Sequence, residues 1–126
     1  MLVAQIQISM QKDDSERVKT GFRIWLEHRN EVFMAPGKAR LLELILKEGS
    51  LSKAAKSMNM SYRKAWYSIK QLNDNSPEPI VILNRGGSQG GSAELTPYGE
   101  KVIEEYNALC RSCSEFLSEK LKNMSI

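Results

Sequence analysis

The sequence has little of what enzymes, metal sites and secreted scaffolds are built from. Its 126 residues include one histidine and two cysteines, too few for a zinc finger or a disulfide-built scaffold. A histidine-based catalytic centre would depend on His28 alone, and no second catalytic group lies at a suitable spacing. We therefore expect no catalytic residue, no metal site and no cofactor.

Long apolar runs and a secretory signal are also absent from the sequence. Apolar runs are only as long as residues 80–83, so no membrane-spanning helix is expected. Residues 1–8 have no basic flank and are interrupted by glutamines, which excludes a secretory signal there. A cytoplasmic protein is predicted.

Positive charge is concentrated in one part of the chain. The formal net charge is +3, but residues 37–74 hold eight basic and three acidic side chains, a local net charge of +5. Such a segment attracts a polyanion, of which the nucleic-acid backbone is the commonest. A solvated helix surface has the same composition, so charge alone leaves both interpretations open.

Apolar periodicity and turn residues divide the chain into three parts. These parts are an N-terminal arm, a domain of mixed elements and a long final helix, over residues 1–20, 21–96 and 97–126. The domain is expected to begin with a β-hairpin over 22–34 that turns at His28, an exposed residue. The sequence then predicts three helices, two strands and the final helix, over residues 38–48, 52–58, 62–73, 80–83, 93–95 and 97–123.

The second and third helices have the spacing of a helix-turn-helix. Ala55 is small where the helices would cross, Asn59 tolerates the left-handed backbone of the turn, and Met60 fills the space beneath it. On the third helix we place Trp66 in the core with Ala65, Ile69 and Leu72. Tyr67 is predicted to point outward.

A strand, a glycine-rich loop and a second strand follow the helix-turn-helix. This order predicts a wing, with Arg85 at its base in reach of a phosphate or the minor groove of DNA. A nucleotide cradle is disfavoured, because the loop lacks the Gly-Lys-Ser/Thr of a P-loop. The predicted fold class is α+β, mainly α: a winged helix-turn-helix with an N-terminal β-hairpin and a long C-terminal dimerisation helix.

Four segments carry a resemblance to a known family: Gly-Ser-Leu-Ser-Lys-Ala-Ala-Lys at 49–56, Met-Ser-Tyr-Arg-Lys-Ala-Trp at 60–66, Gly-Gly-Ser-Gln-Gly-Gly at 86–91 and Leu-Thr-Pro-Tyr-Gly at 95–99. In order and spacing they resemble the N-terminal DNA-binding domain of ModE-type molybdate-responsive transcription regulators, over residues 37–109. LysR-type regulators share the broader fold but look less similar. The resemblance implies a dimeric, sequence-specific binder of duplex DNA in which residues 61–71 read the bases. Family members that sense molybdate carry further oxyanion-binding domains, so molybdate binding is not expected of this sequence.

The predicted DNA-binding residues come from the second helix, the third helix and the wing. Serine and lysine at the start of the second helix are expected to hold phosphates, and the third helix to face base edges. The full set is Ser50, Ser52, Lys53, Ser61, Tyr62, Arg63, Lys64, Tyr67, Gln71, Arg85, Gly86, Gly87, Ser88, Gln89, Gly90 and Gly91. Two-fold symmetry then predicts an inverted-repeat operator. A cytoplasmic DNA binder is also expected to be associated with the nucleoid.

The final helix carries an apolar stripe broader than a small winged-helix core can cover. Pairing with a second copy would bury it. The predicted dimerisation residues are Ile103, Tyr106, Leu109, Cys110, Cys113, Phe116 and Leu117, the cysteines acting as buried small hydrophobes. Alternatively, the helix folds back over the hairpin.

Two alternative functions stay open at this stage. The chain could be a winged-helix protein-interaction module without DNA binding, which its response to salt would reveal. It could also be a small enzyme that uses His28 or the cysteines, although the sequence supplies few partners for either.

Overall fold

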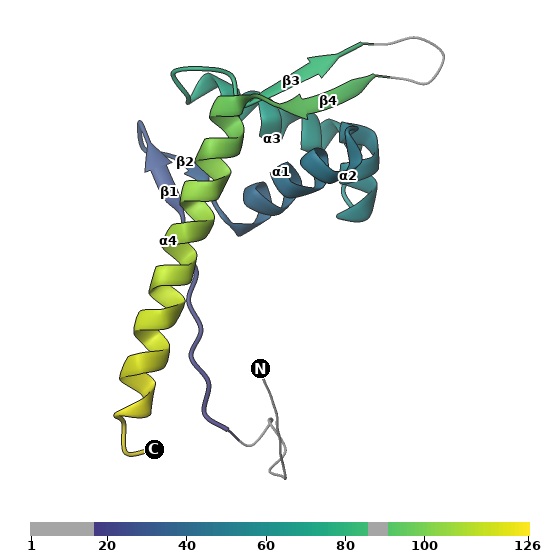
Figure 1. Cartoon of the computed structure of the whole chain (residues 1–126). Helices are drawn as coiled ribbons and strands as arrows, with labels where there is room; N and C mark the ends of the chain where they lie inside the picture. Colours follow the sequence, from purple (N-terminus) through teal and green to yellow (C-terminus); the bar gives the residue numbers. More distant parts are fainter. Residues whose placement is uncertain (1–16, 86–90) are drawn as a thin grey trace. The chain divides into compact units, whose positions relative to one another are not determined.

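The computed structural model describes residues 17–85 and 91–126 (Figure 1). The elements, in chain order, are β1 (Leu26–His28), β2 (Glu31–Met34), α1 (Pro36–Glu48), α2 (Leu51–Ser57), α3 (Tyr62–Asp74), β3 (Val81–Asn84), β4 (Ser92–Leu95) and α4 (Pro97–Lys122). Residues Arg23–Cys113 form one compact unit, which contains every element except the end of α4. The described residues before Arg23 group with Ser114–Ile126 in a second unit. In the described part of the chain no helix is long and apolar enough to cross a membrane.

The predicted hairpin is present but shorter than residues 22–34. Strands β1 and β2 pair antiparallel, and Leu26 faces Met34 at the open end of the ladder. Arg29 and Asn30 have φ of 55° and 66°, the backbone of a tight two-residue turn whose twist matches that of the strands. Residues 22–25 are not in a strand, because β2 ends at Met34 and leaves them no pairing partner.

Local signals set the helix-turn-helix as expected. Gly49 ends α1 with φ of 69°, a conformation that a side chain would strain. The Ser61 hydroxyl accepts the Lys64 N–H at 3.1 Å and so caps the start of α3. Asn59 has φ of 56° in the turn between α2 and α3, and Met60 packs against the core. The expectations for both turn residues are confirmed.

One hydrophobic core joins the helices to the wing strands. Leu41, Leu42 and Ile45 of α1 are fully buried, as expected. The small side chains of Ala54 and Ala55 are buried where α2 meets α1 and α3. Residues from α3, β3 and the position before it, β4 and α4 belong to the same core: Ala65, Ile69, Leu72, Ile80, Val81, Ala93, Leu95, Ile103 and Tyr106.

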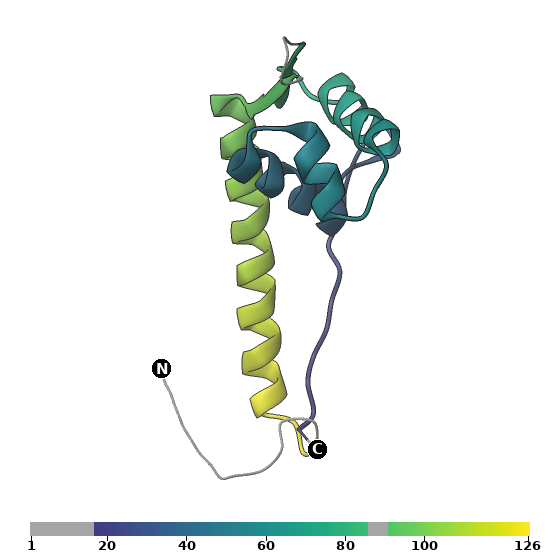
Figure 2. The ribbon, with the colours of Figure 1, turned by 90° about the vertical axis from the view of Figure 1, so that its right-hand side faces the viewer.

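The wing strands are tied to both ends of the helix-turn-helix. β3 and β4 pair in register from Val81 with Leu95 to Asn84 with Ser92. At the start of β3, the Asn73 side chain bonds the backbone of Ile80 and Val81. The Ala93 N–H donates to the Gly49 carbonyl at 3.0 Å, which links β4 to the end of α1. In Figure 2 these strands lie at one end of the compact unit, beyond helices α1–α3.

The first half of α4 packs on this core. Thr96 caps the helix, its hydroxyl accepting the Gly99 N–H at 2.9 Å. The Tyr106 hydroxyl donates to the Ile24 carbonyl at 2.8 Å, and burial raises the pKa of Tyr106 to about 12. Ile103 and Tyr106 were predicted to form a dimer interface, but both are buried inside the chain's own core. This turn of α4 packs beside the residues that precede β1.

Gly99 provides a test of this packing. A Cβ added there would lie 2.2 Å from the Ile80 carbonyl oxygen, a backbone atom that cannot easily move. We expect Gly99→Ala to lower the free energy of unfolding by about 1–3 kcal/mol in urea titrations, because the first turn of α4 must shift. The matched control is Gly37→Ala in α1, where a Cβ meets no atom within 4 Å. Equal effects of the two substitutions would contradict the close approach of α4 to Ile80.

Candidate nucleic-acid interface

The exposed face of α3 presents a connected group of side chains. Tyr67 is 52% exposed, and the Arg63 guanidinium lies 5.9 Å from the centre of its ring. Tyr67 also meets Trp66 edge to face, with ring centroids 5.2 Å apart and planes at 84°. The aromatic pair therefore provides a rigid surface against which the Arg63 guanidinium is oriented.

Lys70 follows one turn later and is paired. Its ammonium donates to the Asp74 carboxylate at 2.8 Å, and both side chains are more than half exposed. The hydrogen bond to Asp74 and the charge of that carboxylate raise the pKa of Lys70. Asp74 thus offsets one positive charge on the exposed face of α3.

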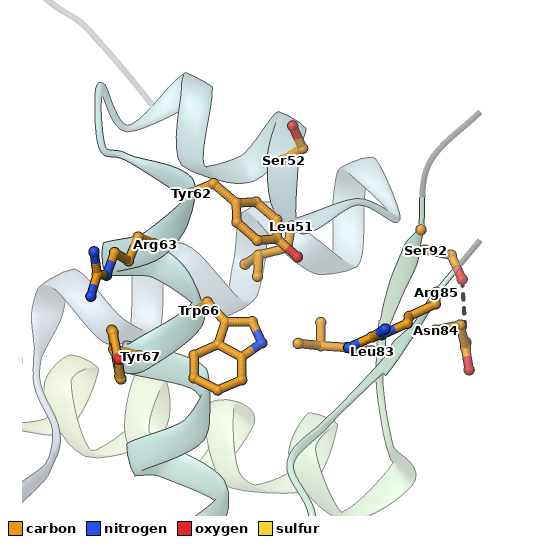
Figure 3. A pocket seen from close by; sticks show the side chains of 11 residues that line it. Leu51, Ser52, Tyr62, Arg63, Trp66, Tyr67, Leu83, Asn84, Arg85 and Ser92 are labelled. Atoms are coloured by element: carbon orange, nitrogen blue, oxygen red, sulfur yellow. Dashed lines mark hydrogen bonds between the residues drawn. The ribbon is translucent and has the colours of Figure 1, made fainter. Parts of the chain in front are cut away.

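A groove of about 720 Å³ lies between α3 and the wing strands (Figure 3). We call it the α3–wing groove. Its wall on the helix side comes from α2 and α3, and its other wall from β3, β4 and the residues next to them. The lining residues are Leu51, Ser52, Tyr62, Arg63, Trp66, Tyr67, Leu83, Asn84, Arg85, Gly91 and Ser92.

The lining has the electrostatic character expected for an anionic ligand. Among the described residues that line the groove, Arg63 and Arg85 are the charged side chains, and none carries a carboxylate. Neither arginine forms an ion pair within the described residues. Both guanidinium groups therefore remain available to phosphate oxygens or base edges.

The placement of Trp66 in the core was wrong. Its side chain is 37% exposed and lines the groove, whereas Ala65, Ile69 and Leu72 are buried as predicted. Trp66 lies at the edge of the buried face of α3, where the neighbouring β3 strand does not cover the whole indole. The prediction that Tyr67 points outward is confirmed.

Gln71, which was predicted to face base edges, makes a contact within the protein. It is half-buried, and its side-chain oxygen accepts a 2.9 Å hydrogen bond from the Lys38 ammonium of α1. Burial lowers the pKa of Lys38. Gln71 therefore links α3 to α1 and does not line the groove. Lys64 is exposed but lies outside the groove lining, and its contact with DNA stays a prediction.

The predicted phosphate-binding residues of α2 lie beside the groove. Ser52 lines it, and Lys53 is exposed. The Ser50 hydroxyl accepts the Lys53 N–H at 3.2 Å, so its oxygen caps α2 while its hydrogen stays free to donate. Tyr62, 54% exposed, stands next to the Ser61 cap.

Part of the predicted wing lies outside the described residues, namely Gly86, Gly87, Ser88, Gln89 and Gly90. The flanking residues Arg85 and Gly91 are described, and both line the groove. The base of the wing therefore lies beside α3.

The remaining dimerisation candidates are at least partly exposed. Leu109 is 42% and Phe116 60% exposed, and Leu117 is half-buried. Cys110 and Cys113 are free thiols and half-buried, where burial was expected. Over the described residues, no group of three histidine, cysteine or acidic side chains could hold a metal ion.

Comparison with known proteins identifies the family. Residues 37–100 match the family described as bacterial regulatory helix-turn-helix protein, lysR family. The chain belongs to this lysR-type family. The match covers both helices of the helix-turn-helix and the wing, which are the elements that form the groove.

Curated relatives of this lysR-type chain carry the name ModE. The molybdenum transport protein ModE of Azotobacter vinelandii is 42% identical over 91 residues, covering 70% of this chain and 34% of that protein. The transcriptional regulator ModE of Haemophilus influenzae is 34% identical, covering 74% of this chain and 36% of that protein. The DNA-binding transcriptional dual regulator ModE of Escherichia coli is 36% identical, covering 68% and 33%. The chain thus spans about a third of the length of these relatives, and the resemblance to ModE-type regulators is confirmed for its helix-turn-helix part.

Among solved structures, the adhesin competence repressor of Streptococcus pyogenes is similar to the chain at a TM-score of 0.48. The sequence identity is 16%, and the match covers 71% of this chain and 66% of that one.

Sequence reasoning missed several residues of the groove in this lysR-type domain. Leu83 is half-buried and faces Trp66 from β3 (Figure 3). Strand alternation could have indicated it, because Val81 is buried and Ile82 is exposed. Asn84 and Ser92 are joined by a 3.2 Å hydrogen bond across the strands, for which the sequence gives no signal.

The Lys70–Asp74 pair leads to a prediction for this lysR-type interface. Asp74→Asn removes a carboxylate from the exposed face of α3 and frees Lys70. We expect tighter binding to every duplex by a few-fold at low salt, with an unchanged free energy of unfolding, because exposed ion pairs stabilise little. Fluorescence anisotropy with labelled DNA measures the affinity.

Glu105→Gln on α4 is the matched control, since it removes the same charge from an exposed residue outside the groove. Equal gains in both variants would show that net charge acts, and not the position of Asp74.

Proposed function

We propose that this chain is a sequence-specific binder of duplex DNA that acts as a homodimer and regulates transcription in the bacterial cytoplasm. The observation that carries the proposal is the α3–wing groove, with an exposed helix on one side and two arginines without a carboxylate partner in the described chain. Membership of the lysR-type family supports it. We assign no molybdate-binding role to these residues.

The exposed face of α3 would contact the base edges. Major-groove recognition needs donors and acceptors that project from a helix into the groove. Arg63 can donate two hydrogen bonds to a guanine, and its position over the Tyr67 ring limits the entropy lost on binding. The Tyr67 hydroxyl can both donate and accept.

Residues on either side of α3 would contact the phosphates of the duplex. Ser50, Ser52 and Lys53 lie at one side of the helix-turn-helix, and Arg85 lies at the base of the wing. Such contacts orient the domain on the duplex without reading its sequence. Together they would hold α3 in the major groove.

The homodimer is supported by the apolar side chains that α4 leaves exposed. Leu109 and Phe116 are the most exposed of the predicted set, whereas Ile103 and Tyr106 belong to the core. An isologous pairing through the exposed residues would present two copies of α3, and so favour an inverted-repeat operator with half-sites about one helical turn apart, or a multiple of it.

Selection of bound duplexes from a random library tests the proposed function. An enriched inverted repeat, bound with an affinity that falls steeply as salt rises, is the expected result. Absence of any preferred sequence would overturn the specific function. Absence of duplex binding at any salt concentration would instead favour a protein-interaction module.

The two arginines should behave differently when changed to alanine. Arg63→Ala should cost about 1–3 kcal/mol on the selected operator and relax the preference at one position of each half-site. Arg85→Ala should weaken all duplexes equally and reduce the salt slope by about one per subunit. Both variants should fold, because neither side chain is part of the core. A uniform loss in Arg63→Ala would contradict the proposed orientation of α3.

Phe116→Asp tests the homodimer. Placing a charge on the exposed apolar surface of α4 should shift the sedimentation of the protein from dimer to monomer and weaken operator binding. Ser118→Asp, which adds the same charge at an exposed position on the side of α4 opposite Phe116, is the control. A monomeric unaltered chain would refute the proposed assembly.

A further inference from the structure

Trp66 is partly exposed in the α3–wing groove. Its indole is 37% exposed, and its N–H has no hydrogen-bond partner among the described residues. A tryptophan side chain offers a large apolar surface and usually finds a partner for its one donor. The indole therefore leaves both an apolar face and a hydrogen-bond donor unused in the groove.

The surroundings of Trp66 combine an apolar floor with a polar rim. Leu83 faces the indole from β3 (Figure 3), and the buried Leu51 also lines the groove. The rim carries the Arg85 guanidinium and the Ser52 and Ser92 hydroxyls, and no carboxylate from residues 17–85 or 91–126. A ligand that fits this lining alternates carbon surface with negative charge along its length. The sugar-phosphate chain of a nucleic acid has that pattern.

The position of the groove on the domain favours contact with the sugar-phosphate backbone of DNA rather than with its bases. Arg63 and Tyr67 also line the groove, but in Figure 3 their side chains lie on the side of α3 away from the wing strands, which would point at the base edges. Trp66 lies on the flank of the helix that faces the wing, where the wall of a major groove would be. That wall is sugar and phosphate.

We propose that the α3–wing groove holds one sugar-phosphate strand of the duplex, with the Trp66 indole against deoxyribose carbons and the Arg85 guanidinium on a neighbouring phosphate. This assignment rests on the proposed function and adds to it a DNA contact at Trp66. It also assigns the contact a role: Trp66 contributes affinity for every sequence and reads none.

The salt dependence of DNA binding distinguishes the contribution of the Trp66 indole from that of the Arg85 guanidinium. Trp66→Leu removes an apolar contact that releases no counterion, so it should weaken binding to every duplex by about tenfold at an unchanged salt slope. Arg85→Ala should reduce the slope. Trp25→Leu is the matched control, because Trp25 is also half exposed but lies on the segment before β1, outside the groove. It should leave the affinity unaltered.

The fluorescence of Trp66 gives a test that needs no change in the groove. The chain has two tryptophans, so Trp25→Phe leaves Trp66 as the one indole that emits. In the free protein this indole should be open to quenching by acrylamide. Saturation with either the selected operator or an unrelated duplex at low salt should remove most of that quenching.

Three results would overturn the proposal. Trp66 could stay open to acrylamide while the duplex is bound, it could be protected by the operator alone, or Trp66→Leu could weaken the operator alone. The last two would make Trp66 a base-reading residue.

Failure of the proposed function gives different results. The unaltered chain would bind no duplex, or it would bind all duplexes equally while Trp66 is still protected. In the latter case the groove assignment would stand without sequence specificity.

Discussion

The side chain of Asn73 is the contact on which the geometry of the interface depends. Its oxygen accepts the N–H groups of Ile80 and Val81 at 2.7 and 3.2 Å, and its amide donates to the Val81 carbonyl at 3.0 Å. One amide therefore fixes the start of β3 against the last turn of α3. A partly buried backbone N–H or C=O without a hydrogen-bond partner destabilises the fold, so the start of β3 resists displacement from α3. The width of the α3–wing groove follows from it.

The end of α3 is held from the opposite side by the hairpin. His28 makes a 2.8 Å hydrogen bond through Nδ1 with the carbonyl of Asn75, the residue that follows α3. The side chain of Asn75 is buried and donates to the Gln71 carbonyl at 2.9 Å. The hairpin thus has a structural role, and the single histidine belongs to it. A helix held in this way loses little conformational freedom when a ligand binds, which favours affinity.

The sequence predicted the elements and the helix-turn-helix well, because their signals are local. Gly49, Asn59 and Ser61 each act within a few residues of their own position. The errors concern contacts between distant parts of the chain. Gln71 meets Lys38 across 33 positions, and Tyr106 meets Ile24 across 82. Helical periodicity places Trp66 beside the buried face, and only the position of β3 decides how much of it is covered. Charge patterning identified the basic segment, but the groove exists only once the wing packs against α3.

The edge-to-face contact between Trp66 and Tyr67 has an evolutionary consequence. The two rings lie on adjacent positions of α3, one at the flank and one on the exposed face, and each limits the rotamers of the other. A substitution at Tyr67 on the exposed face also changes the support of the Trp66 indole in the groove, and the reverse holds. Descendants of this domain would therefore have to change both positions together to acquire a new target sequence at constant overall affinity. Pairwise covariation of these two positions is the trace that such a history leaves.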